Sequence, residues 1–203
     1  MNIRMTLSSL ALTTLAAFAT VAYQDHPGDH ATGDRAATNE SEADLQPITI
    51  IALRHAEKGD DDPRDPGLTE AGTARAKQLE SILAHAGVTH VFSTNYRRTQ
   101  ETIAPLAATM GIDVATYNPQ DIPGFAAKMA RLAPGSVAVI AGHSNTTPDL
   151  VKALGGQAKD LTEMRGMHLI PEEEYNRLYV LTLPSPEHTN PGPVTTLELR
   201  YGE

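Results

Sequence analysis

Two histidines stand directly behind apolar segments of this 203-residue chain. Arg54 and His55 follow the apolar run at residues 48–53, and His143 follows a second apolar run at residues 137–141 after one glycine. A neutral imidazole can attack phosphorus, while a second imidazole can donate a hydrogen bond to the charge that develops on the phosphoryl oxygens. The placement of both histidines at the ends of apolar runs therefore points to phosphoryl chemistry.

A third segment adds Arg97, which follows the short apolar run 89–93 and begins an expected helix. Guanidinium groups such as those of Arg54 and Arg97 bind phosphate oxygens through two parallel hydrogen bonds. The free N–H groups at a helix start also favour an anion. Cations beside an imidazole lower its pKa and keep it neutral near pH 7. We therefore expect a phosphate site, with Asn145 as a further phosphate-binding candidate.

Alternating strand-like and helix-like segments must bring these residues together. We expect strands at 48–53, 89–93, 114–117, 137–141, 175–183 and 194–201, and helices at 69–85, 97–110, 124–132 and 147–154. This alternation predicts an α/β fold, a three-layer α/β/α sandwich with a mostly parallel sheet. Ligands bind such sheets at the carboxyl ends of the strands, so the three segments should meet at one edge.

The composition excludes several classes of protein. The absence of cysteine excludes disulfide frameworks, thiolate metal sites and a cysteine nucleophile. A net charge of −9 argues against a broad basic face for nucleic acid, and 4% aromatic residues argue against base stacking. The histidines lack the spacing of metal ligands, and the acidic loop 60–65 lacks the spacing of a calcium loop. We therefore expect neither a metal site nor a nucleic-acid partner.

The motifs together resemble those of the histidine phosphatase superfamily, also called the phosphoglycerate mutase-like family. The resemblance rests on Arg54-His55, the Ser-x-x-x-Arg segment 93–97, Gly142-His143, and the segment 65–72, which resembles the opening of the family's first helix. The residues Ala-Glu-Lys at 56–58 resemble a branch of short members, some of them exported.

The resemblance implies a phosphoglycerate mutase-like fold and a two-step reaction. His55 would attack the phosphoryl group and become phosphohistidine, which water would then hydrolyse. Arg54, Arg97 and His143 would hold the phosphate through both steps. No metal or organic cofactor is implied.

The proton donor for the leaving oxygen is open at this point. Some branches of the family carry Asp directly after the second histidine, but this chain has Ser144 there. A carboxyl within hydrogen-bond reach usually supplies the proton. Glu57 is our first candidate and Asp121 the second. The alternatives are that Glu57 only pairs structurally with Lys58 or Arg98, or that no acid is placed at all.

Three functions fit these residues. The first is a phosphomonoester hydrolase that acts on a phosphorylated small molecule through phosphohistidine at His55. The second is a phosphohistidine protein phosphatase, and the third is a non-catalytic module that binds phosphorylated ligands. Specificity should lie in segments 58–67, 118–124 and 155–174, which carry no readable code, and we expect the three glutamates at 172–174 to be a solvated approach to a strand.

The N-terminal part of the sequence differs from the rest. Arg4 and the apolar run 7–22 predict a signal peptide at residues 1–22, with cleavage after Ala19 or Ala22. Residues 23–46 hold six acidic residues and one basic residue and predict a disordered linker. The expected domain then spans 47–203, in a periplasmic or secreted protein with no stable membrane anchor after cleavage.

Overall fold

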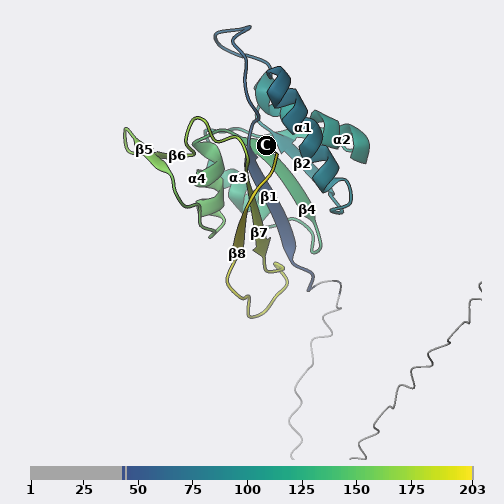
Figure 1. Ribbon diagram of the computed structural model, residues 1–203. Coiled ribbons are helices and arrows are strands. Elements are labelled where there is room, and N and C mark those ends of the chain that lie inside the picture. Colours follow the sequence, from purple (N-terminus) through teal and green to yellow (C-terminus); the bar gives the residue numbers. More distant parts are fainter. Residues whose placement is uncertain (1–42, 44, 203) are drawn as a thin grey trace, which may run out of the picture. The chain divides into compact units, whose positions relative to one another are not determined.

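The computed structural model describes residue 43 and residues 45–202 (Figure 1). The predicted signal peptide at 1–22 and nearly all of the predicted linker at 23–46 lie outside the described residues. The elements are β1 (Ile48–Arg54), α1 (Glu70–Leu83), β2 (His90–Ser93), α2 (Arg97–Met110), β3 (Val114–Thr116), α3 (Ile122–Met129), β4 (Val137–Gly142), α4 (Thr146–Ala153), β5 (Thr162–Met164), β6 (Met167–Leu169), β7 (Arg177–Leu183) and β8 (Thr195–Arg200).

The main sheet has six strands in the order β3-β2-β4-β1-β7-β8. The strands β3, β2, β4 and β1 are mutually parallel, β7 runs antiparallel to β1, and β8 runs antiparallel to β7. The predicted mostly parallel sheet is therefore confirmed. Because β1 and β4 are parallel neighbours near the centre, their carboxyl ends lie side by side at one edge.

Successive residues of β1 face opposite layers, as expected of a strand buried on both faces. Ile48, Ile50 and Ala52 belong to the core that includes α3 and α4, whereas Ile51 and Leu53 belong to the core that includes α1 and α2. Figure 1 shows the two helix pairs on opposite sides of the sheet. The predicted three-layer sandwich is confirmed.

Local sequence signals set several element ends. The Thr69 hydroxyl accepts a hydrogen bond from the Gly72 amide at 3.1 Å and caps α1, so the helix begins one residue later than expected. The helix α3 begins at Ile122, earlier than expected, because the Asp121 carboxylate caps it through the Gly124 amide. Gly111 ends α2 in the left-handed conformation at φ 65°.

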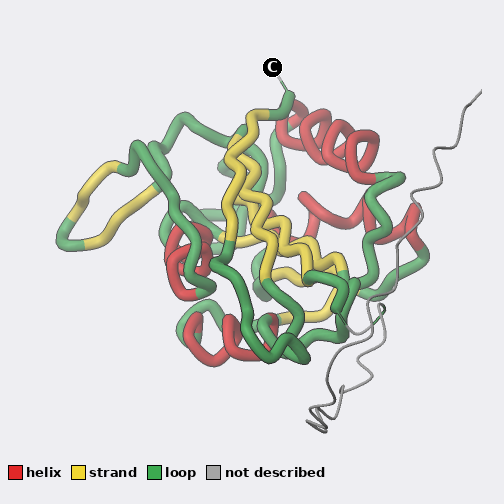
Figure 2. The backbone as a smooth tube through the Cα atoms, turned by 90° about the horizontal axis from the view of Figure 1, so that it is seen from below, coloured by secondary structure: helices red, strands yellow, loops and turns green. Residues whose placement is uncertain are grey.

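The short hairpin of β5 and β6, which stands out from the main sheet in Figure 2, was not predicted from the sequence. Its strands have three residues each, too few to show a period of two. The turn between them holds Arg165 at φ 53° and Gly166 at φ 77°, the positive angles that two-residue hairpin turns require. No helix of the described residues is long and apolar enough to cross a membrane.

Candidate functional site

The register between β1 and β4 brings the two histidine segments together. Arg54 is paired with Gly142, and the His55 amide donates to the Gly142 carbonyl at 2.9 Å. The rings of His55 and His143 consequently lie 5.5 Å apart between centroids and meet at 69°. The expected convergence at one sheet edge is therefore found.

A cavity of about 730 Å³ opens at this edge. Its lining combines both histidines, three cationic side chains, two glutamates and apolar residues from the hairpin: Arg54, His55, Lys58, Tyr96, Arg98, Pro119, Gln120, His143, Ser144, Asn145, Thr146, Thr162, Met164, Leu169, Ile170, Pro171, Glu172 and Glu173. All three segments expected to carry specificity contribute to it. The hairpin reaches the site because the Ile170 amide donates to the Ser144 carbonyl at 2.8 Å.

His55 is held as a neutral ring with one defined nitrogen lone pair. Its Nδ1 lies 2.7 Å from the Ala56 carbonyl oxygen. Because a carbonyl only accepts, Nδ1 must carry the proton, and Nε2 keeps its lone pair. Burial lowers the pKa of His55 to about 3, with Arg54 and His143 adding to the effect against the Ala56 hydrogen bond. The expected lowering by nearby cations is real but is smaller than that of burial.

A chain of hydroxyl groups orients His143. The Thr99 hydroxyl donates to the Tyr96 carbonyl at 2.7 Å, so the Thr94 hydroxyl, 2.7 Å away, donates to Thr99. The Thr94 oxygen, 3.1 Å from His143 Nε2, is then free to accept the Nε2 proton. That tautomer leaves Nδ1 as an acceptor 3.5 Å from Arg98 Nη2. Burial, helped by the neighbouring arginines, lowers the pKa of His143 to about 4.

Arg54 is 4% exposed and is fixed by the segment that precedes β7. Its Nη1 donates to the carbonyls of Pro171 at 2.9 Å and Glu172 at 2.8 Å, and its guanidinium carbon lies 4.1 Å from the Tyr175 ring centroid. Its Nε is buried and has no partner among the described residues. Burial lowers the pKa of Arg54, whereas Tyr175, Glu172 and Glu173 oppose that lowering. Arg54 thus lines the cavity as a buried cation held in place by backbone carbonyls.

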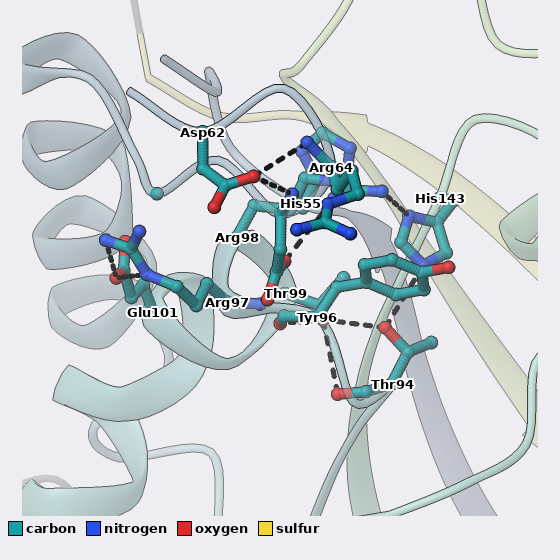
Figure 3. Close-up of polar contacts among 12 residues, drawn as sticks. His55, Asp62, Arg64, Thr94, Tyr96, Arg97, Arg98, Thr99, Glu101 and His143 are labelled. Carbon is teal, nitrogen blue, oxygen red and sulfur yellow. Dashed lines mark hydrogen bonds and ion pairs between the residues drawn. The ribbon is translucent and has the colours of Figure 1, made fainter. Parts of the chain in front are cut away.

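The second arginine of the cavity is Arg98, and not the expected Arg97. The Arg97 side chain is 49% exposed and pairs with Asp61 at 2.9 Å and Glu101 at 3.3 Å. Figure 3 shows Arg97 pointing toward Glu101 while Arg98 lies beside His143. Arg98 also stacks over Tyr96, with 4.4 Å from its guanidinium carbon to the ring centroid, and its buried Nε lacks a partner among the described residues. Consecutive helical residues point about 100° apart, so only one of the two arginines can face the cavity.

The start of α2 was expected to offer free N–H groups to a phosphate anion, and this expectation is also wrong. The Arg97 amide already donates to the Asp65 carboxylate at 2.9 Å, so this helix end carries its own anion. The start of α4 faces the cavity instead, since His143, Ser144, Asn145 and Thr146 line it. The structure thus brings Asn145 into the cavity, as the sequence predicted for a phosphate-binding candidate.

Neither proposed proton donor lies in the cavity lining. The Glu57 carboxylate pairs with Arg75 at 2.7 Å, not with Lys58 or Arg98. Burial opposes ionisation of Glu57, but the hydrogen bonds and charge of Arg75 outweigh it and lower the pKa of that carboxyl. Asp121 caps α3 and lines a separate, smaller hollow. An ionised, ion-paired carboxyl is a poor proton donor, so the geometry favours neither residue as the acid.

Sequence reasoning left Arg98 open between the pocket and an outward position, and it gave Lys58, Glu172 and Glu173 no individual role within the segments expected to carry specificity. Arg98 had a signal, because the spacing from Thr94 to Arg98 equals that from Ser93 to Arg97. Glu172 and Glu173 had none, since their position depends on the Arg54 contacts to the backbone of their own segment. Within the described residues, no three His, Asp or Glu side chains gather as a metal site requires.

Comparison with known proteins agrees with this geometry. The family model of the histidine phosphatase superfamily (branch 1) matches residues 50–118, which span most of β1 and all of α1, β2, α2 and β3. Among proteins of curated function, none matches this sequence.

Solved structures of similar fold cover most of the domain. The protein histidine phosphatase SixA complexed with tungstate is 13% identical, with 75% of this chain and 96% of that chain covered and a TM-score of 0.54. A protein of Escherichia coli K-12, provisionally assigned as an α-ribazole-5′-phosphate phosphatase, is 12% identical, with 75% and 96% covered and a TM-score of 0.56. A protein of Agrobacterium tumefaciens, provisionally assigned as the phosphohistidine phosphatase SixA, is 17% identical, with 76% and 97% covered and a TM-score of 0.50.

The class that these findings define is an α/β protein of phosphoglycerate mutase-like fold. The family model that matches part of this chain, residues 50–118, is that of the histidine phosphatase superfamily (branch 1).

Proposed function

We propose that the protein is a histidine phosphatase, a phosphomonoester hydrolase that works through phosphohistidine at His55. One observation carries the proposal. The buried His55 ring keeps an unprotonated Nε2 in a cavity that Arg54, Arg98 and His143 also line. That combination suits a nucleophile beside a phosphate-binding site. The family match over residues 50–118 supports it.

In the first step, His55 Nε2 attacks phosphorus and the bond from phosphorus to the leaving oxygen breaks. The new N–P bond puts positive charge on the ring, and the Ala56 carbonyl stabilises it through Nδ1–H. Arg54 and Arg98 hold the equatorial oxygens, where charge is concentrated. His143 lies beside Arg98, and a proton taken up from solvent on Nδ1, which the bound dianion favours, would give it a donor toward the same oxygens.

In the second step, water attacks phosphorus and the N–P bond breaks. The electron pair returns to Nε2, the water proton leaves to solvent, and inorganic phosphate is released. His55 is then neutral again because its low pKa prevents it from keeping a proton at pH 7. The buried Nδ1–H to Ala56 hydrogen bond keeps Nε2 directed for the next turnover.

A specific observation favours a second candidate, hydrolysis of phosphohistidine on a protein. Glu57 and Asp121 lie outside the cavity lining, so neither would protonate a poor leaving group. Substrates whose leaving group departs readily, including phosphohistidine, gain from such a site. Two of the solved structures of similar fold carry the name phosphohistidine or protein histidine phosphatase.

The test is hydrolysis of p-nitrophenyl phosphate by the wild type and His55→Ala. The leaving group of this substrate needs little help from an acid, so turnover depends on the nucleophile and the phosphate site. We expect wild-type turnover and a loss of at least about 1,000-fold in His55→Ala. Equal rates for both proteins would refute the nucleophile, and an inactive wild type that binds phosphate would support the non-catalytic binding module.

Export is a separate part of the proposal and rests on the N-terminal sequence alone. N-terminal sequencing of the protein from its source cells should start at Thr20 or Tyr23. A protein that still begins at residue 1 or 2 would rule out cleavage.

A further inference from the structure

Two carboxylates in the cavity lining have no partner among the described residues. The side chains of Glu172 and Glu173 form neither an ion pair nor a hydrogen bond there, although both line the cavity. The neighbouring Glu174 instead pairs with Arg177 and Arg200. Arg54 fixes the segment by its hydrogen bonds to the carbonyls of Pro171 and Glu172. The backbone that carries these two exposed glutamates is therefore fixed beside the buried arginine that would bind phosphate.

Carboxylates beside a phosphate site need a reason, because they repel the phosphate dianion. The lining carries three cations, Arg54, Arg98 and Lys58, against Glu172 and Glu173. Within the lining this leaves one net positive charge for an incoming dianion, and the Asp65 carboxylate, 3.8 Å from Arg98 outside the lining, offsets part of it. A phosphate ester with an uncharged leaving group would leave the cavity negative by one. An ester that also carries one ammonium group would leave it neutral.

Resting on the proposed function, we propose that the substrate is a zwitterionic phosphomonoester. Its phosphate lies against Arg54, Arg98 and the two histidines, and an ammonium group on its leaving group lies against Glu172 and Glu173. The cavity of about 730 Å³ has room for a leaving group of this kind beyond the phosphate.

The same arrangement explains how the leaving oxygen could depart without a proton donor from the protein. An ammonium group close to the departing oxygen stabilises the negative charge that forms there. The alcohol then leaves and takes its proton from water, and no protein acid is required. This agrees with the positions of Glu57 and Asp121 outside the lining.

The experiment compares two probes that differ in the ammonium group, O-phosphoethanolamine and 2-hydroxyethyl phosphate. We would measure kcat/KM for each, and the inhibition constant of each against p-nitrophenyl phosphate hydrolysis. Wild type should favour the ammonium probe by about 10-fold in either measurement. The preference should shrink as salt is raised, because Glu172 and Glu173 are exposed.

Replacing Glu172 and Glu173 by glutamine, singly (E172Q, E173Q) or together, should change kcat/KM for the two probes in opposite directions. These variants should weaken the ammonium probe about 10-fold and improve 2-hydroxyethyl phosphate by a few-fold, because a repulsive charge is removed. E163Q is the matched control: it removes the same charge from the hairpin strand β5 outside the cavity lining, and should leave the ratio unchanged.

Three results would overturn the inference. The wild type could show no preference for the ammonium probe, or E163Q could change the ratio as much as E172Q and E173Q do. The double variant could also weaken both probes equally, as loss of a proton donor or of local structure would. Failure of the proposed function is a different result, namely no turnover of p-nitrophenyl phosphate by the wild type. The inhibition constants still test the inference if neither probe is hydrolysed.

Discussion

The rings of His55 and His143 lie 5.5 Å apart because Arg54 and Gly142, the residues before them, are directly paired between two parallel strands. Each ring has one nitrogen whose role is fixed by a neighbour: Nδ1 of His55 by the Ala56 carbonyl, and Nε2 of His143 by the Thr94 hydroxyl. The sheet register and these two hydrogen bonds thus determine which nitrogens remain for phosphate.

Both histidines should stay neutral in the folded protein far below pH 6.5. Their folded pKa values are about 3 for His55 and about 4 for His143, whereas in the unfolded chain both bind protons near pH 6.5. The unfolded state therefore gains protons first on acidification. Stability is fully present above pH 6.5 and falls as the pH drops toward 4 by about 1 kcal/mol per pH unit for each histidine.

Urea unfolding of the wild type and His143→Gln at pH 7 and pH 4.5 measures this effect. The wild type should lose more stability between the two pH values than the variant, which cannot be protonated there. Equal losses would contradict neutral burial of His143.

Binding of phosphate should raise the pKa of His143. A phosphate dianion placed between Arg98 and His143 Nδ1 favours a proton on that nitrogen. NMR titration of ring nitrogens should show the pKa of about 4 move upward by at least one pH unit when vanadate or phosphate is added. An unchanged titration would mean that His143 does not touch the anion.

Arg98 and Arg97 should differ sharply in their effect on activity. Arg98→Ala removes a charged donor from the cavity and should lower kcat/KM for p-nitrophenyl phosphate by about 100-fold. Arg97→Ala removes exposed ion pairs to Asp61 and Glu101 and should change it by less than about 3-fold. The reverse ranking would restore Arg97 as the phosphate ligand and place Arg98 in a structural role.

The Thr94 hydroxyl should act by positioning His143. Thr94→Val keeps the volume but removes the acceptor for the Nε2 proton, so kcat should fall about 10-fold. Thr94→Ser should restore the rate. Ring-nitrogen NMR separates this from a packing effect, because only a lost acceptor shifts the His143 tautomer in Thr94→Val.

Glu57 should stabilise the fold without serving as the acid. Its carboxylate accepts hydrogen bonds from Arg75 at 2.7–3.0 Å, and Gly72 packs so tightly on the Glu57 backbone that a Cβ there would clash with the Glu57 carbonyl oxygen. Glu57→Gln leaves the Arg75 charge only partly paired and should cost about 2 kcal/mol of unfolding free energy. Hydrolysis of an alkyl phosphate per folded molecule should be unchanged, and a slower reaction would return Glu57 to catalysis.

Elements that consist of a continuous apolar run were predictable from the sequence. The continuous apolar runs at 48–53 and 137–141 become β1 and β4, and the polar residues behind them become the cavity because parallel strands end at one edge. Short elements such as the β5–β6 hairpin have too few residues for a pattern to show.

The errors at the site have physical causes of their own. Choosing Arg97 over Arg98 depended on which helix face meets the cavity, and a one-residue shift turns a side chain by about 100°. Glu57 lies two residues after His55, yet its direction follows from Arg75 on α1, a contact between distant segments. Glu172 and Glu173 reach the cavity through backbone contacts of their segment, among them the Arg54 hydrogen bonds and the Ile170 bond to Ser144, which no side-chain pattern encodes.

Trapping of the covalent intermediate tests the central claim most directly. The wild type and His55→Ala would be mixed with a ³²P-labelled phosphomonoester, quenched within milliseconds in base, and digested for mass spectrometry. We predict label on the peptide that contains His55, stable in base and lost in acid as a phosphohistidine is, and none in His55→Ala. Turnover by the wild type without label on His55, or label that persists in His55→Ala, would contradict the account.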